Sequence, residues 1–177
     1  ELWIEQEDFR AEAPRKFHRL TPGREVRLRY AYYVTATGFD VDPATGAPCT
    51  VRCRYDPATR GGDSADGRTV RGTIHWVSAR HAATAEVRLF DHLFACDDPE
   101  DVPEGGDFIA NLNPRSLEVL PAVPIEPALA ATAPGASVQF ERKGYFSLDA
   151  RDSRPGHPVF NRSVPLKDTW AKLEARA

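Results

Sequence analysis

Hydrophobic and polar residues alternate with a period of two along much of this chain of 177 residues, a pattern typical of β-strands. The clearest alternation runs from Glu25 to Thr37 and puts five apolar side chains on one face: Val26, Leu28, Tyr30, Tyr32 and Val34. Further strands are predicted at residues 2–4, 49–55, 70–77, 85–90, 116–120, 137–142, 145–150 and 159–164. The pattern therefore indicates an all-β fold.

Turn signals divide these strands into two groups. Residues 42–46 (Asp-Pro-Ala-Thr-Gly) predict a hairpin turn between the strands on either side of them. Residues 24–93 are expected to form a small closed barrel of antiparallel strands, and the strands after residue 108 a second barrel. The acidic stretch 97–107, which contains proline and glycine, is either the linker between the two or a surface loop.

Helical signals are few, because fifteen prolines and twelve glycines are spread along the chain. Residues 6–13 are predicted to form an acidic loop or one helical turn, and residues 108–112 a helical turn. One longer helix is expected from Leu166 to Arg176, where apolar residues have helical spacing and a proline precedes the first turn.

Charge is distributed unevenly, although the formal net charge is only −3. From Arg10 to Arg29 there are seven Lys or Arg and two acids, a local balance of +5. From Cys96 to Asp107 there are six acids and no base. One basic face on an acidic body positions a polyanion better than uniform charge does.

Catalytic and metal-binding motifs are absent from the sequence. There is no phosphate-binding glycine loop, no nucleophile elbow and no paired-histidine metal motif, and the three cysteines lack zinc-ligand spacing. We therefore predict no catalytic residue and no metal site. No signal peptide or membrane-spanning run is visible and the thiols suit a reducing compartment, so we expect a soluble, cytoplasmic chain. The lack of any methionine suggests a piece of a longer protein.

Recognition is the stronger signal, and it centres on residues 14–34, where a basic, aromatic loop leads into the clearest strand. Arginine offers charge for phosphate and a planar donor fork for a base edge, and aromatic rings offer faces for unstacked bases. Taken singly, each arginine here could be a solvated surface residue, and Tyr30 and Tyr32 are expected to pack in the core.

Several blocks of residues, in order along nearly the whole chain, resemble the C-terminal anticodon-binding region of glutaminyl-tRNA synthetase, a class I aminoacyl-tRNA synthetase. The Ile-His-Trp-Val and Gly-Tyr-Phe blocks are the most specific. The blocks are Glu1-Leu-Trp-Ile4, Asp8-Phe-Arg10, Gly23-Arg-Glu-Val-Arg-Leu-Arg29, Gly72-Thr-Ile-His-Trp-Val-Ser78, Glu86-Val-Arg-Leu-Phe-Asp-His-Leu-Phe94, Asn113-Pro-Arg-Ser-Leu117, Gln139-Phe-Glu-Arg-Lys-Gly-Tyr-Phe146, Val159-Phe-Asn-Arg162 and Leu166-Lys-Asp-Thr-Trp-Ala-Lys172.

This resemblance implies two antiparallel β-barrels, proximal and distal to a catalytic domain, that grip unstacked anticodon bases. It implies residues 1–20 as a proximal strand and connection, 21–95 as the distal barrel, 96–107 as the acidic loop or linker, and 108–177 as the proximal barrel with short helices and the C-terminal helix. The catalytic domain, which uses ATP and Mg, would precede this chain, so no cofactor is expected in the fragment itself.

The resemblance also implies roles for individual residues. Arg19 matches the reader of the third anticodon base, a guanine. Arg27 matches the reader of the first base, a cytosine or modified uracil, and Gln139 matches a contact to the central uracil. Arg29 and Arg142 match supporting or phosphate contacts. Lys16 and His18, near Arg19, stand where the family often has glutamine and where it often has lysine or another residue.

The function that follows is recognition of the glutamine tRNA anticodon by a chain that is not itself catalytic. The implied partners are the anticodon loop and the catalytic domain of the parent enzyme, with neither DNA nor membrane, and the expected state is a monomer. Two alternatives stay open: the similar region of an archaeal or eukaryotic type of glutamyl-tRNA synthetase, and a structural or interaction module that does not bind RNA.

Overall fold

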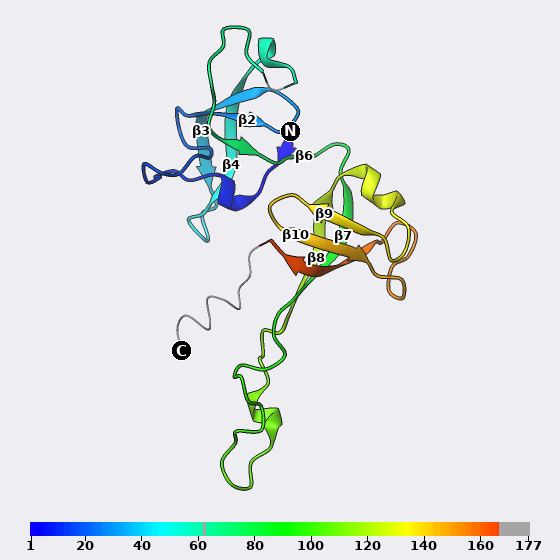
Figure 1. Cartoon of the computed structure of the whole chain (residues 1–177). Coiled ribbons are helices and arrows are strands. Elements are labelled where there is room, and N and C mark those ends of the chain that lie inside the picture. The colour runs from blue at the N-terminus through cyan, green and yellow to red at the C-terminus, as the bar shows by residue number, and fades with distance from the viewer. Residues whose placement is uncertain (62, 167–177) are drawn as a thin grey trace. The chain divides into compact units, whose positions relative to one another are not determined.

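The computed structural model describes residues 1–61 and 63–166, which form strands joined by turns and short 3₁₀ helices (Figure 1). The predicted all-β class is confirmed. The chain divides into two compact units, Glu1–Arg80 (unit 1) and His81–Ala177 (unit 2). The helix predicted from Leu166 to Arg176 falls on residues 167–177, which are outside the described part of the chain.

Unit 1 is built on a four-stranded sheet with the order β4-β3-β2-β5 and a separate pair, β1 with β6. Its core contains apolar residues of the sheet together with Phe9 and Leu20, which lie on a parallel bridge outside it. The elements are β1 (Leu2–Trp3), η1 (Gln6–Asp8), β2 (Glu25–Leu28), β3 (Tyr33–Val41), β4 (Pro48–Asp56), η2 (Pro57–Thr59), β5 (Thr73–Ile74) and β6 (Val77–Ser78).

The long strand predicted from Glu25 to Thr37 is wrong, because a tight turn divides it into β2 and β3. The N–H of Leu28 donates to the carbonyl of Tyr32 across this turn, at 2.9 Å. Tyr30 lies at the turn with a φ of 57° and is 79% exposed, so the prediction that it packs in the core is also wrong. A non-glycine residue at positive φ is uncommon, so the sequence carries no signal for this turn.

The hairpin predicted around residues 42–46 is confirmed between β3 and β4. The Asp42 carboxylate accepts the backbone N–H groups of Ala44 and Thr45 at 2.7 and 3.0 Å, and Gly46 adopts a φ of 69°. These hydrogen bonds lower the pKa of Asp42. They also stabilise the turn that the sequence predicts.

Unit 2 is a five-stranded sheet with the order β8-β7-β11-β10-β9. Among the strand pairings of this sheet in the described residues, that of β11 with β7 is parallel and the others are antiparallel. Phe146 and Phe160 are 2% and 0% exposed and both pack against Phe140. The elements are β7 (Ala83–Phe90), η3 (Phe108–Asn111), β8 (Leu117–Ile125), η4 (Pro127–Ala131), β9 (Ser137–Phe140), β10 (Gly144–Leu148) and β11 (Val159–Pro165).

The acidic stretch lies within unit 2, in the connection between β7 and β8, and is therefore a loop rather than a linker between units. Figure 1 shows this connection as an arm that leaves the sheet. Backbone hydrogen bonds join its two sides, from Asp91 to Ser116, from Asn113 to Leu93 and from Ala95 to Asn111. The helical turn predicted at 108–112 is present in the arm as η3.

Two segments lie in other units than the resemblance implied. Residues 85–90 were expected in the first barrel, but they form β7, which pairs with β8 and β11 in unit 2. Leu2–Trp3 was expected with the second group of strands, but it pairs with Val77–Ser78 in unit 1. Both differences arise from pairing between strands that are far apart in the sequence.

Neither sheet closes on itself through the strand pairings of the described residues, because the sheets end at β4 and β5 and at β8 and β9. The described residues therefore form two open sheets and the separate pair of β1 with β6, and two closed barrels are not confirmed. Within the same residues, no helix has the length and apolar character needed to cross a membrane.

Asp149 is expected to make the stability of unit 2 depend on pH below about 4. Its carboxylate accepts the backbone N–H groups of Asp152 and Arg151, both at 2.8 Å, and the side-chain amide of Asn161 at 2.6 Å. Chiefly through the bond from Asp152, these contacts lower its pKa from 3.8 to about 2. Because the pKa is lowered in the folded state, the stabilisation is complete above the unfolded-state pKa and is lost as the pH falls toward 2.

We expect Asp149→Asn to destabilise the chain at pH 7 and to reduce the loss of stability between pH 5 and pH 2. The asparagine would place an amide donor against the amide of Asn161, so one acceptor is lost. Denaturant unfolding of both proteins across this range is the measurement. The exposed Asp97→Asn is the control, and an equal change in the two variants would contradict the role of Asp149.

Candidate nucleic-acid interface

Arg19 directly precedes Leu20 of the unit 1 core and contacts two acidic residues of η1. Its Nη1 lies 2.9 Å from Oδ1 of Asp8 and 3.5 Å from Oε1 of Glu7, and it donates to the Glu7 carbonyl at 3.4 Å. The Asp8 side chain is completely buried, whereas that of Arg19 is 34% exposed. The arginine is therefore anchored at one end and open to solvent at the other.

The basic loop in front of Arg19 is a folded segment with several contacts of its own. The guanidinium of Arg10 lies 5.0 Å from the centre of the Phe17 ring, and Nη1 of Arg24 donates to the Phe17 carbonyl. Lys16 and His18, on either side of Phe17, are exposed. The loop thus presents a basic and an imidazole side chain to solvent from a backbone fixed through Phe17.

Gly72 joins this loop to the strand that carries Arg27. A Cβ on this glycine would lie 2.2 Å from the His18 carbonyl oxygen, so the two backbones are in close contact. The carbonyl of Gly72 accepts the backbone N–H of Arg27 at 2.8 Å. Gly72 therefore contacts both the backbone of His18 and the backbone of Arg27.

Arg27 lies in the middle of the unit 1 sheet, paired with Tyr33 on β3 and Thr73 on β5. Its Nε donates to the Thr73 hydroxyl at 3.4 Å, and its Nη1 lies 3.9 Å from the fully exposed carboxylate of Asp63. The side chain is 37% exposed. Long, solvent-screened contacts of this kind are weak, so a ligand could replace them at small cost.

Arg29 comes directly after β2, in the turn that the alternation did not reveal. Its guanidinium stacks on the exposed ring of Tyr30, 4.9 Å from the ring centre, and donates to the Tyr30 hydroxyl at 3.2 Å. The backbone carbonyl of Arg29 accepts the indole N–H of Trp76 at 3.0 Å. An arginine and an aromatic face are therefore presented together at this turn, which is a combination suited to unstacked bases.

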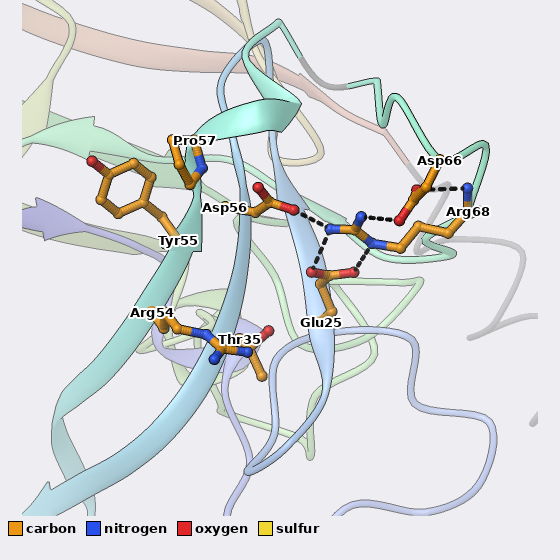
Figure 2. Close-up of a pocket in the computed structure, with 8 residues that line it drawn as sticks. All are labelled: Glu25, Thr35, Arg54, Tyr55, Asp56, Pro57, Asp66 and Arg68. Carbon is orange, nitrogen blue, oxygen red and sulfur yellow. Dashed lines mark hydrogen bonds and ion pairs between the residues drawn. The ribbon is translucent and has the colours of Figure 1, made fainter.

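Arg68 organises a cluster of carboxylates that lie on β2, on β4 and in the loop at 66–68. Figure 2 shows its guanidinium between Glu25, Asp56 and Asp66, and it also lies over the ring of Tyr33, 5.3 Å from the centre. These bonds raise the pKa of Arg68, through Glu25 first. The side-chain hydrogen bond from Arg68 lowers the pKa of Asp56.

A shallow pocket of about 480 Å³ adjoins this cluster, and Arg54 and Thr35 lie in its lining beside the four paired residues (Figure 2). Arg68 and the carboxylates tie the segment after β4 to the sheet, because they join β2, β4 and the loop at 66–68. Among residues 1–61 and 63–166, no three His, Cys, Asp or Glu side chains form a set that could hold a metal.

Gln139 and Arg142 belong to unit 2, on the hairpin of β9 and β10. Gln139 is exposed on β9 and pairs across the strands with Tyr145, whose side chain is 46% exposed. Arg142 is half-buried in the hairpin turn with a φ of 64°. The hairpin thus displays an amide, an aromatic ring and a guanidinium within seven residues.

Sequence reasoning identified the arginines and Gln139 but missed three residues that shape these surfaces. Tyr145 alternates with the buried Phe146, so its exposure could be read only once the strand register was known. Asp8 lies in a segment that reads as an acidic loop, and Arg68 lies in a turn-rich stretch. A buried carboxylate so close to Arg19 carries no signal in the local sequence.

Comparison with known proteins identifies the family to which this chain belongs. Residues 1–56 and residues 73–149 each match the family described as tRNA synthetases class I (E and Q), anti-codon binding domain. The chain belongs to this family, and its two matched segments cover most of both units.

Within that class, the chain is similar to glutamine–tRNA ligases over nearly all its length. It is 54% identical to the enzyme of Nitrobacter winogradskyi over 175 residues, which is 99% of the chain and 30% of the relative. It is 51% identical to that of Rhodopirellula baltica (99% and 29%) and 50% identical to that of Vibrio campbellii (98% and 30%). The chain spans about 30% of the length of these relatives.

Proposed function

We propose that this chain reads the anticodon of glutamine tRNA as the anticodon-binding part of a glutamine–tRNA ligase. The observation that carries the proposal is the family match over both units, which coincides with the surfaces built around Arg19, Arg27 and Gln139. In this role the chain binds RNA and performs no chemistry itself. Ligation of glutamine, with ATP and Mg, falls to the part of the parent enzyme that is outside this chain.

Arg19 is assigned to the third anticodon base, Arg27 to the first and Gln139 to the central one. A guanidinium offers parallel donors to guanine O6 and N7, and an amide can donate to and accept from a uracil edge. Arg29, Arg142, Lys16 and His18 are assigned to the backbone and to neighbouring bases. A wrong base leaves a polar group unpaired, which costs about 1–3 kcal/mol per pair.

The two units are proposed to correspond to the two barrels of the family, unit 1 to the distal and unit 2 to the proximal one. The parent enzyme is proposed to act in the cytoplasm as a monomer. Neither DNA nor a membrane is a partner in this proposal.

Arg19→Ala is expected to weaken binding of a glutamine anticodon stem-loop about tenfold or more and to remove the preference for guanine at the third position. The loss arises because the alanine has no donor for O6 and N7. The measurement is titration of the chain with four stem-loops that differ only at this position. Because Asp8 loses a partner in this variant, thermal unfolding is followed alongside.

The matched control is Arg15→Ala, which removes an exposed arginine from the same loop. It should weaken all four stem-loops slightly and equally, since a phosphate contact carries no sequence information. Equal losses for all four bases in Arg19→Ala would reduce Arg19 to such a contact.

Replacing guanine by cytosine at this position separates a glutamine reader from a glutamate reader. A lack of binding even at low salt would favour a module that does not bind RNA.

A further inference from the structure

We propose that Asp8 is a specificity-determining positioning residue: its buried carboxylate holds Nη1 of Arg19 and thereby aims the Nε–Nη2 edge of the guanidinium at the base. The inference rests on the proposed function, in which Arg19 reads the third anticodon base. In this inference Asp8 does not contact the RNA itself. It determines the base selectivity of Arg19, which does.

The first observation is burial. The Asp8 side chain is completely inaccessible to solvent and lies 2.9 Å from Nη1 of Arg19. A carboxylate out of water needs charged or hydrogen-bonding partners, so its contact with the guanidinium is strongly favoured over a free arginine. An exposed ion pair would leave the arginine to sample many rotamers, whereas this one restrains it.

The second observation is the backbone around the pair. The carbonyl of Asp8 accepts the N–H of Leu20 at 3.0 Å, and the carbonyl of Leu20 accepts the N–H of Arg10 at 3.1 Å. Phe9 and Leu20 form a parallel bridge, and both are buried in the unit 1 core. Residues 8 and 19 are therefore set in a fixed relation by their neighbours, and the carboxylate cannot follow a moving arginine.

The third observation is which edge of Arg19 is occupied. All three contacts, to the Asp8 carboxylate, the Glu7 carboxylate and the Glu7 carbonyl, are made by Nη1. Nε and Nη2 donate no hydrogen bond to any residue that the structure describes, and the side chain remains 34% exposed. These two donors form one flat edge, which matches the paired acceptors O6 and N7 of guanine.

Together these contacts explain selectivity rather than affinity. A mobile guanidinium would still attract the phosphate backbone, because its charge is unchanged. Only a guanidinium fixed in angle distinguishes two adjacent acceptors from the donor and acceptor pattern of adenine. Losing the Asp8 carboxylate should therefore reduce the preference for guanine more than it reduces binding.

The test is titration of the full 177-residue chain, carrying Asp8→Asn, with stem-loops that have guanine or adenine at the third anticodon position. The expected result is a preference for guanine reduced about tenfold, with discrimination at the central position within twofold of the unchanged chain. The same substitution in an Arg19→Ala background should change the third-position preference no further. If Asp8→Asn keeps the full preference, or lowers binding equally in both backgrounds, the inference is overturned.

A second variant keeps the inference testable if Asp8→Asn fails to fold. Arg19→Lys retains a positive partner for Asp8 but has no planar edge. It is expected to bind the guanine stem-loop with most of its affinity and to lose the preference for guanine. A lysine variant that retains the preference would overturn the inference. If the unchanged chain itself shows no third-base preference, it is the proposed function that fails.

Discussion

Gly72→Ala is expected to destabilise unit 1 by about 3 kcal/mol and to weaken anticodon stem-loop binding at least tenfold. The added Cβ would lie 2.2 Å from the His18 carbonyl oxygen and 3.0 Å from Cγ1 of Val26. Val26 is completely buried, and the oxygen belongs to the backbone, so neither neighbour can rotate away. The loop that carries Lys16, His18 and Arg19 must then separate from β5.

The binding loss follows from the two contacts that Gly72 makes. It touches the backbone of His18, next to Arg19, and its carbonyl accepts the N–H of Arg27. A displacement here should therefore reduce discrimination at the third and first anticodon positions together. Denaturant unfolding and titration with base-substituted stem-loops measure the two effects.

Gly38→Ala is the matched control for this variant. It lies in the same sheet, and its added Cβ would meet only the guanidinium of Arg52, at 3.3 Å, which is the end of a flexible side chain. We expect a change in stability within about 0.5 kcal/mol and unaltered binding. If both glycine variants behave alike, the contact with His18 does not fix the reading loop.

The hydrophobic pattern was sufficient to predict the class of fold and most of its strands, because period-two alternation is a local property. Strands near 49–55, 85–90, 137–142 and 159–164 are present in the structure with small changes in their ends. β8 is longer than predicted and continues through Pro121 and Pro124 at the edge of its sheet, where proline is tolerated. Local pattern could not, however, predict which strands pair.

The pairing of distant segments is what the sequence leaves undetermined. β7 joins unit 2 through a parallel contact with β11, some seventy residues later, and β1 pairs with β6 after a similar separation. The turn at Tyr30 was missed for a different reason. Alternation continues across it, and its left-handed residue is a tyrosine rather than glycine or asparagine.

The candidate site shows the same division between local and distant information. Arg19, Arg27 and Gln139 could be selected from the sequence, since residue chemistry and resemblance to a family both point to them. Their surroundings could not, because Asp8 contacts Arg19 only once the chain has folded back, and Arg68 contacts Glu25, which is distant in the sequence. The structure therefore adds the residues that hold the proposed base-reading side chains in place, whereas the base-reading side chains themselves were selected from the sequence.

Gly144→Ala is expected to have the corresponding effect in unit 2, destabilising the β9–β10 hairpin by about 3 kcal/mol. Gly144 has a φ of 147°, which L residues rarely adopt, and an added Cβ would lie 2.6 Å from the Val164 carbonyl oxygen on β11. The strand must shift away from β11 and carry Arg142 and Tyr145 with it. Discrimination at the central anticodon position should fall, as it should in Gln139→Ala, while the preference for guanine at the third position is retained.

Gly156→Ala separates backbone strain from steric clash, the two effects expected in Gly144→Ala. Gly156 has a φ of 79°, but no atom lies within 4 Å of an added Cβ. It should cost about 1–2 kcal/mol of backbone strain and leave central-base discrimination unchanged. Because Gly72 and Gly144 lie in different units, their alanine variants should affect different anticodon positions. A Gly144→Ala chain that discriminates at the central base as well as the unchanged chain would remove this hairpin from the interface, and equal losses at all three positions would indicate general unfolding instead.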